Sequence, residues 1–256
     1  MIVGGDAGFG GGDAEEETDL QRARIARELI TAVRGLPPEE VPEALCRSCA
    51  ALLPSVAGLS VSVLGDGPDS AVVLFASDET ATRLAEIQYT LGEGPSPEAV
   101  RLRAPVFAPD LRRGPDVRRW PLFSDQAARA GVEAAFSVPL AGAGGALGTL
   151  DLYRETAGGL DGDEVRTALL VADAVVLAVT ALDRASADTD GVVTWLAGAE
   201  SDREEIHQAT GMIMAQLEIG AEEALLILRA RAFAQGRTSS EVARAVIDRT
   251  MDMRHD

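Results

Sequence analysis

The residues of this chain that could take part in chemistry are mostly arginines. All 23 positions occupied by lysine or arginine are arginine, asparagine is also absent, and histidine occurs only at His207 and His255. A chain without lysine has no group for a Schiff base or for a Walker-type phosphate loop, and no acid–base or nucleophile constellation is recognisable. The planar guanidinium fork suits phosphates and base edges. The sequence therefore indicates recognition of anions, not an enzyme, and no cofactor is expected.

Two cysteines, Cys46 and Cys49, resemble half of a zinc or redox motif in the stretch "CRSC". The surrounding residues repeat with a helical period that places Leu45, Cys49 and Leu52 on one face. No second pair of cysteines or histidines is available to complete four ligands. Since an unpaired cysteine is among the most buried residue types, both thiols are predicted to lie in a core without a metal.

The charge of the chain limits its partners. The formal net charge is −18, which argues against a general coating of nucleic acid or of an anionic membrane and leaves room for a local basic patch. No apolar run is long enough to span a bilayer, and the start of the chain lacks the basic and apolar regions of a secretory signal. We therefore expect a cytoplasmic protein without a membrane partner. Residues 1–17, rich in Gly, Asp and Glu, are predicted to be disordered.

Apolar patterns and turn residues predict the elements of residues 18–185. A helix capped at Thr18 and the cysteine-bearing helix come first, followed by a hairpin of "GLSVSVLG" and "SAVVLFAS". Then follow a helix at 78–90, a helix with Pro95 or Pro97 near its start, a strand at 105–111, a helix at 120–131, two strands within 134–155 and a long apolar helix at 161–182. The glycine-rich "AGAGGALG" lacks the G-x-G-x-x-G spacing and is predicted to be a hairpin turn. This order predicts an α+β fold with a mostly antiparallel sheet flanked by helices.

This part of the chain resembles a GAF domain. The segments "FSVPL…GGALGTLDLY" and "QYTLGEGPSPEAV" carry the resemblance, and the second is similar to GAF domains of actinobacterial regulators. The resemblance implies a domain for sensing or dimerisation. Neither asparagine nor lysine is present for a cyclic-nucleotide motif, no histidine is present for haem, and Ser96 stands where related sequences often have cysteine. Two alternatives stay open: a dimerisation module with a small or vestigial pocket, or a sensor of an unknown small molecule.

Three further helices are predicted at the C-terminus. They cover "VVTWLAGAESDREEIHQATGMIMAQL", "AEEALLILRARAFAQ" and "VARAVIDRTMDM", and a capping box at Thr238 to Glu241 opens the third. The apolar stripes consist of Ile206, Ile213, Leu217, Leu225, Leu228, Ala232, Val242, Val246 and Ile247. Three amphipathic helices of this size predict an all-α bundle. Gly211 interrupts the first helix at a cost of roughly 1 kcal/mol relative to alanine, and is predicted to allow close helix packing.

The three helices resemble an ANTAR domain. The matching patterns are I-x-x-A-x-G-x-x-M at Ile206 to Met214, EAL-x-x-LR at Glu223 to Arg229 and R-x-x-x-x-VA at Arg237 to Ala243. Thr210 and Ser239 depart from the family, which often has lysine and leucine at these positions. The resemblance implies transcription antitermination through RNA binding, with paired stem-loops in tandem as the partner. The candidate RNA-binding residues are Thr210, Arg229, Arg231, Phe233, Arg237 and Arg244.

The RNA-binding hypothesis depends on a local patch, since residues 196–256 hold seven arginines and eleven acidic residues. Arg237 and Arg244 are seven positions apart and would share a helix face if the third helix began early enough. Phe233 could stack on a splayed base. The predicted division is a tail at 1–17, a GAF-like domain at 18–185, a linker helix at 186–195 and the ANTAR domain at 196–254. The helices at 18–34 and 161–182 predict a homodimer, which the helix through Trp195 could extend. The alternative function is a dimeric signalling scaffold that does not bind RNA.

Overall fold

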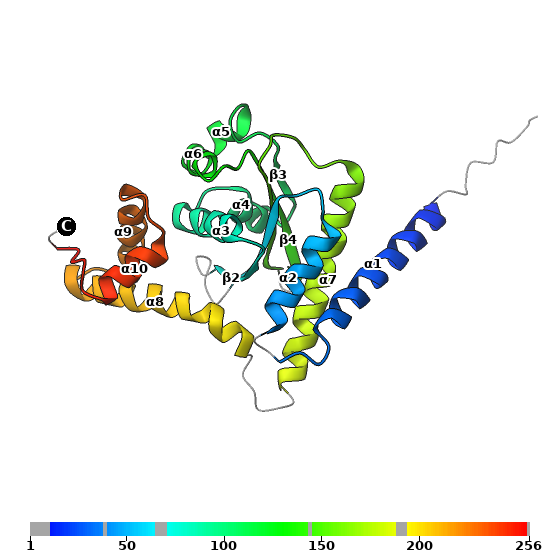
Figure 1. Cartoon of the computed structure of the whole chain (residues 1–256). Coiled ribbons are helices and arrows are strands. Elements are labelled where there is room, and N and C mark those ends of the chain that lie inside the picture. The colour runs from blue at the N-terminus through cyan, green and yellow to red at the C-terminus, as the bar shows by residue number, and fades with distance from the viewer. Residues whose placement is uncertain (1–10, 38–39, 65–70, 143–144, 188–193, 255–256) are drawn as a thin grey trace, which may run out of the picture.

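The computed structural model describes residues 11–37, 40–64, 71–142, 145–187 and 194–254, without the side chains of 11–19 and 181–203. An α+β body extends to Ala187, and three C-terminal helices lie at one side of it (Figure 1). Helix α1 (Gly11–Val33) begins seven residues before the start predicted at Thr18. The first ten residues of the predicted tail lie outside the described residues.

The body is built on a five-stranded antiparallel sheet. Its strands are β1 (Gly58–Leu64), β2 (Ala71–Ala76), β3 (Val106–Ala108), β4 (Ala134–Gly142) and β5 (Gly145–Arg154). They lie in the order β2-β1-β5-β4-β3, and every neighbouring pair is antiparallel, which confirms the predicted sheet. Gly142 pairs with Gly145 at the end of β4 and β5, which confirms the expected hairpin of these two strands. Gly148 lies where a Cβ would come within 1.9 Å of the Ser62 carbonyl oxygen.

Helices cover both faces of the sheet. Helices α1, α2 (Val41–Leu52) and α7 (Gly162–Ala187) pack on one face, and their core includes Val61, Phe136 and Leu150. The other face carries α3 (Glu79–Leu91), α4 (Pro95–Leu102), α5 (Pro115–Arg119) and α6 (Pro121–Arg129). Successive strand residues point to opposite faces, which is why Phe136 belongs to the first core and Ala135 to the second. The short helix α5 was not predicted from the sequence.

Both cysteines lie in the first core, as predicted. Cys49 is fully buried on α2 and Cys46 nearly so. Burial raises the pKa of Cys49 to about 12 and that of Cys46 to about 11, so both remain protonated thiols near neutral pH.

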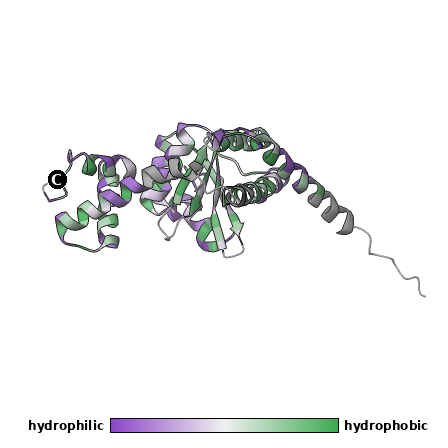
Figure 2. Ribbon diagram, turned by 90° about the horizontal axis from the view of Figure 1, so that it is seen from below, coloured by the Kyte–Doolittle hydropathy of each residue, from purple (hydrophilic) through white to green (hydrophobic). Residues whose placement is uncertain are grey.

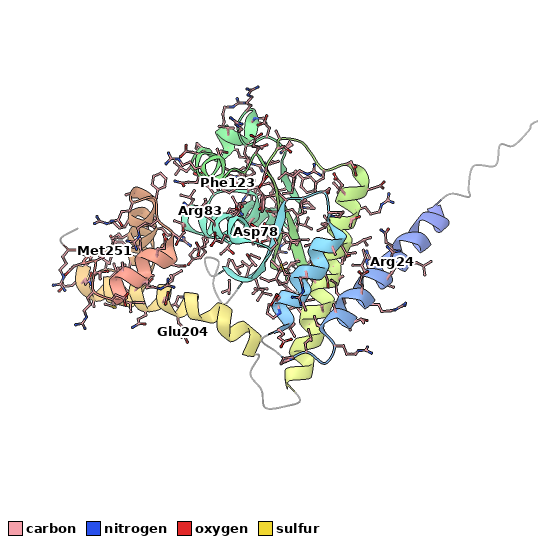
Figure 3. All side chains as sticks on the ribbon, in the orientation of Figure 1. Arg24, Asp78, Arg83, Phe123, Glu204 and Met251 are labelled. Atoms are coloured by element: carbon pink, nitrogen blue, oxygen red, sulfur yellow. The ribbon has the colours of Figure 1, made fainter. Side chains whose placement is uncertain are left out.

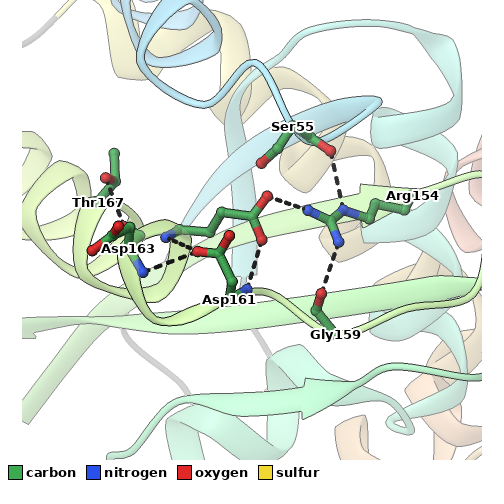
Figure 4. Close-up of polar contacts among 7 residues, drawn as sticks. Ser55, Arg154, Gly159, Asp161, Asp163 and Thr167 are labelled. Carbon is green, nitrogen blue, oxygen red and sulfur yellow. Dashed lines mark hydrogen bonds and ion pairs between the residues drawn. The ribbon is translucent and has the colours of Figure 1, made fainter.

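Polar contacts fix where α7 begins (Figure 4). The Asp161 carboxylate accepts hydrogen bonds from the backbone N–H groups of Asp163 (2.9 Å) and Glu164 (2.8 Å), which otherwise lack partners at a helix start. Arg154 on β5 donates to the carbonyl oxygens of Ser55 (3.0 Å) and Gly159 (2.8 Å) and pairs with Glu164 at 2.6 Å. One arginine thus joins the end of the sheet to the loop after α2 and to α7.

The C-terminal helices are α8 (Thr194–Leu217), α9 (Ala221–Ala234) and α10 (Ser239–Ile247). The predicted stripes form a separate core, in which Ile213, Leu228 and Val246 are fully buried. The strands in Figure 2 are mostly hydrophobic, whereas these helices alternate hydrophobic and hydrophilic residues. The predicted capping box is present: the Glu241 N–H donates to Thr238 Oγ1 (3.2 Å) and the Thr238 N–H donates to Glu241 Oε2 (2.8 Å).

The prediction that Gly211 permits close packing is wrong. A Cβ built at this glycine would have no heavy atom within 4 Å, and the residue is exposed. Among the side chains of α8 that the structure describes, the buried ones are Ile206, Ala209, Thr210 and Ile213, so the inward face passes beside Gly211. Ala209 on α8 and Ala232 on α9, both fully buried, are the small residues that lie in the bundle core.

Candidate nucleic-acid interface

Two candidate residues, Arg229 and Phe233, lie four positions apart on α9 and share a helix face. This face is turned toward α3 of the GAF-like body. The Arg229 guanidinium carbon lies 4.7 Å from the centre of the Tyr89 ring, which is a cation–π contact between the two parts of the chain. The side chain is half-buried there, so in this arrangement Arg229 is only partly accessible to a large partner.

Phe233 and Arg237 also lie where α9 and the start of α10 meet α3, a contact region that we call the seam. Together with Arg83, Ile87 and Thr90 of α3 they line a cavity of about 20 Å³. Figure 3 shows Arg83 on the side of α3 that faces the C-terminal helices. Phe233 keeps 41% of its surface exposed, enough to present a ring edge to a base. The seam therefore places an aromatic ring beside guanidinium groups, a combination that suits stacking and phosphate contacts.

Arg237 does not lie on α10. This helix begins at Ser239 after the Thr238 cap, so the condition under which Arg237 and Arg244 would share a helix face is not met. Instead, Arg237 Nη2 donates to the carbonyl oxygen of Glu241 at 2.6 Å and lies beside the first turn of α10. Arg244 is exposed and reaches Glu205 on α8 with two nitrogen atoms, at 3.3 and 2.9 Å. A phosphate that binds Arg244 would have to compete with this carboxylate.

The remaining two candidates differ in accessibility. Arg231 is half-buried on α9. Thr210 is 9% exposed, and its hydroxyl donates to the carbonyl oxygen of Ile206 on the same helix at 2.7 Å. The structure thus brings Arg229, Phe233 and Arg237 together at the seam, places Arg244 beside α8 and leaves Thr210 in the bundle interior.

Three further residues at the seam were not predicted. Thr90 and Ser239 are 6% and 1% exposed, and their hydroxyl oxygens lie 3.0 Å apart. The Ser239 N–H also donates to Thr90 Oγ1 at 3.2 Å, so a residue of the GAF-like body satisfies an N–H group at the start of α10. Tyr89 supplies the ring below Arg229. One signal for this contact was present in the sequence, because Ser239 is a polar residue where the ANTAR family commonly has leucine.

A cavity of about 110 Å³ lies between the sheet and helices α3 and α4. Its lining includes Gln88, Ser96 and Thr149, and Arg229 reaches it from the C-terminal bundle. Ligand pockets commonly measure about 300–1,000 Å³, so this cavity suits only a very small molecule. The Gln88 amide oxygen accepts from the Ser96 N–H at 2.8 Å, and the Ser96 and Thr149 hydroxyls lie 2.8 Å apart.

Asp151 is buried behind this cavity. Its carboxylate accepts hydrogen bonds from the hydroxyls of Ser137 and Thr149, the latter at 2.9 Å. Burial raises the pKa of Asp151 to about 6, although the hydroxyl contacts act in the opposite direction. Within the described residues, no three His, Cys, Asp or Glu side chains are grouped so that they could hold a metal ion. None of the described helices has the length and apolar content required to cross a bilayer.

Comparison with protein families places these features in context. Residues 36–180 match the model of the GAF domain, and residues 196–247 match that of the ANTAR domain. The first match spans more than half of the chain, which therefore belongs to the GAF domain family. It is a GAF–ANTAR regulator: a GAF signalling domain precedes an RNA-binding ANTAR domain, as predicted from the sequence.

Several solved structures are similar to this chain. The GAF domain of a phosphoenolpyruvate-protein phosphotransferase from Coxiella burnetii is 15% identical and has a TM-score of 0.49, with 66% of this chain and 98% of that chain covered. The GAF domain of a putative sensor histidine kinase from Pseudomonas syringae pv. tomato is 18% identical, with 70% and 99% covered and a TM-score of 0.41. A type II free methionine-R-sulfoxide reductase from Thermoplasma acidophilum is 16% identical, with 56% and 92% covered and a TM-score of 0.42. No curated protein matches the chain.

Proposed function

We propose that this protein is a transcription antitermination regulator that binds paired RNA stem-loops through its C-terminal helices under control of the GAF domain. The observation that carries the proposal is the ANTAR match over residues 196–247, within which Arg229, Phe233 and Arg237 lie close to one another. Both domains are regulatory, which supports a role without catalysis. Action on nascent RNA agrees with the cytoplasmic location expected from the sequence.

The arginines would act mainly on phosphates. Side chains cannot read the deep, narrow major groove of A-form RNA, so proteins recognise RNA by its backbone and by unstacked loop bases. Arg237 is half-buried and Arg244 is exposed, so each could contact a phosphate, while Phe233 stacks on a loop base. Thr210 remains a candidate from the family pattern, although its hydroxyl is engaged within α8. Because the whole chain carries a charge of −18, binding must depend on these few contacts.

Salt dependence tests this site. Each phosphate contact contributes about 0.7 to 0.9 to the slope of log affinity against log salt. A double variant with Arg237→Ala and Arg244→Ala removes two such contacts, so its slope should be smaller by about 1.5 than that of the wild type. The matched control replaces Arg47 and Arg129, two exposed arginines of the GAF domain, with alanine and should leave the slope unchanged. Equal slopes for the wild type and the Arg237/Arg244 variant would contradict the assignment.

The number of stem-loops provides a second test. If the protein is a dimer, it offers two bundles, and the second binding event becomes intramolecular. An RNA with two stem-loops in tandem should therefore bind more tightly than either stem-loop alone. Gel shifts with both RNAs at equal salt would measure the difference. A single stem-loop that binds as tightly as the tandem RNA would oppose the paired arrangement.

A dimeric signalling scaffold that does not bind RNA is the second candidate. Two observations favour it: Glu205 already neutralises Arg244, and Arg229 already packs on Tyr89. The cavity of about 110 Å³ is also below the usual volume of ligand pockets, which favours a small or vestigial pocket over a sensor of a small molecule. RNA selected from a random pool would decide between the candidates, since a scaffold would enrich no stem-loop sequence.

A further inference from the structure

At the seam between the two domains, candidate RNA-binding residues contact a surface of the GAF domain. Its contacts come from the C-terminal part of α3 on one side and from α9 and the start of α10 on the other (Figure 1). Tyr89 packs on Arg229, Thr90 bonds to Ser239, and Ile87 lies with Phe233 around a cavity of about 20 Å³. Tyr89 also packs against the core of the C-terminal bundle.

The Thr90–Ser239 pair makes this seam specific. Burying a hydroxyl costs free energy unless the group is hydrogen-bonded, and both hydroxyls here are buried and bonded to each other. The Ser239 N–H is one of the amide groups that the first turn of α10 leaves without an intrahelical partner, and Thr90 accepts its hydrogen bond. The N-terminus of α10, which is partially positive, thus lies at the last turn of α3, which is partially negative. Both groups are satisfied in the described relative position of the two domains.

The same seam covers part of the candidate RNA-binding surface. Arg229 is half-buried, with its guanidinium over the Tyr89 ring and against the cavity of about 110 Å³. A stem-loop cannot enter a cavity of this size. Phe233 and Arg237 also line the seam, so an RNA that used all three residues would take the place of α3.

We propose that the C-terminal part of helix α3 is a docking surface for the RNA-binding bundle, and that docking and RNA binding are mutually exclusive. This inference rests on the proposed function and adds its regulation. The described arrangement is the closed state, in which the GAF domain holds Arg229 and Phe233. Release of the bundle from α3 exposes these side chains and permits RNA binding. A ligand that binds the released state more tightly than the closed state shifts the population toward the released state by as much as its difference in affinity allows.

Substitution of Thr90 tests the docking contact. Thr90→Val keeps the shape of the side chain but leaves the buried Ser239 hydroxyl and N–H without this partner, which favours the released state. If docking favours the closed state about ten to one, the variant should bind a tandem stem-loop RNA, selected in vitro, about tenfold more tightly than the wild type. The matched control is Thr82→Val, an exposed threonine on the same helix away from the seam, which should bind like the wild type. Circular dichroism and thermal unfolding would show that both variants remain folded.

A disulfide across the seam should hold the bundle in the closed state. The Thr90 and Ser239 oxygens are 3.0 Å apart, so cysteines at both positions can be joined with a small adjustment. The oxidised Thr90→Cys/Ser239→Cys protein should lose RNA binding at least a hundredfold, and reduction should restore it. Cys46 and Cys49 are buried with raised pKa values and should not react.

The outcomes separate this inference from the proposed function. Tighter binding by Thr90→Val together with redox-dependent binding by the double cysteine variant would support mutual exclusion. RNA binding that is equal in the wild type, in Thr90→Val and in the oxidised double variant would overturn the docking inference and leave the proposed function intact. Failure of the wild type, Thr90→Val and the reduced double variant to bind any selected RNA would overturn both.

Discussion

At the scale of single residues, Asp151 has the most unusual environment. It is a carboxylic acid in the middle of β5, hydrogen-bonded to Ser137 and Thr149, and burial raises its pKa from 3.8 to about 6. A raised native pKa means that the folded protein holds the proton more tightly than the unfolded chain. The contribution of protonated Asp151 to the free energy of unfolding is therefore complete below about pH 4 and is lost as the pH rises toward 6.

We expect Asp151→Asn to remove this pH dependence, because the amide is neutral at every pH. A pKa difference of about two units corresponds to about 3 kcal/mol. Between pH 4 and pH 7, the unfolding free energy should therefore decrease by about 3 kcal/mol less in the variant than in the wild type. Urea unfolding at a series of pH values measures the difference. Asp125→Asn, at an exposed ion pair with Arg129, is the control and should keep the slope of the wild type. A slope for Asp151→Asn like that of the wild type would contradict the assigned pKa.

At the scale of elements, Gly211 lies in the middle of α8, where it is exposed and has no packing role. Gly211 has free space around its Cα, so alanine can be accommodated there without a clash. Alanine should stabilise the helix by about 1 kcal/mol, and calorimetry should show a higher unfolding temperature for the bundle. Gly236 provides the contrast, because its φ of 63° is a left-handed conformation that alanine adopts at a cost. Gly236→Ala should therefore lower the unfolding temperature. A lower unfolding temperature for Gly211→Ala would contradict the free space around this glycine.

At the scale of the whole molecule, α1 and α7 leave apolar side chains at the surface. They pack on each other, and Arg22 pairs with Asp173 at 3.1 Å between them. Leu20 on α1 is 67% exposed, and Leu169 and Leu177 on α7 are 39% and 48% exposed. Leu169 and Leu177 lie on the same helix face as Asp173, at a spacing of four residues. This surface is where we expect a second copy of the chain to pack.

The homodimer can be tested by light scattering at micromolar concentration. The expected mass is twice the chain mass of 26.7 kDa. Leu177→Glu places a charge within the apolar surface and should shift the protein to the monomer, whereas Leu102→Glu, at an exposed leucine of α4, should not. A wild-type protein with the mass of one chain would refute the dimer. Trp195, considered as an extension of this interface, has a side chain outside the described residues.

Most of the order of the elements, and both domain families, could be predicted from the sequence. Apolar periodicity, the hairpin signals and the Thr238–Glu241 capping box depend on residues close together in the chain, so they could be recognised without a structure. The start of α1 and the helix α5 were missed. Helix α5 spans only five residues, which is too short to show a helical period.

What the outward faces of the helices contact depends on how distant segments pack in three dimensions. Gly211 is exposed because the neighbouring helices pack against the positions on either side of it. Arg244 is paired with Glu205, 39 positions away, and Ser239 bonds to Thr90, 149 positions away. The helical period shows which residues share a face, but which partner covers that face depends on contacts between distant segments. The resemblance to the ANTAR family could suggest the candidate arginines, while the seam that covers Arg229 follows from the packing of the bundle on α3.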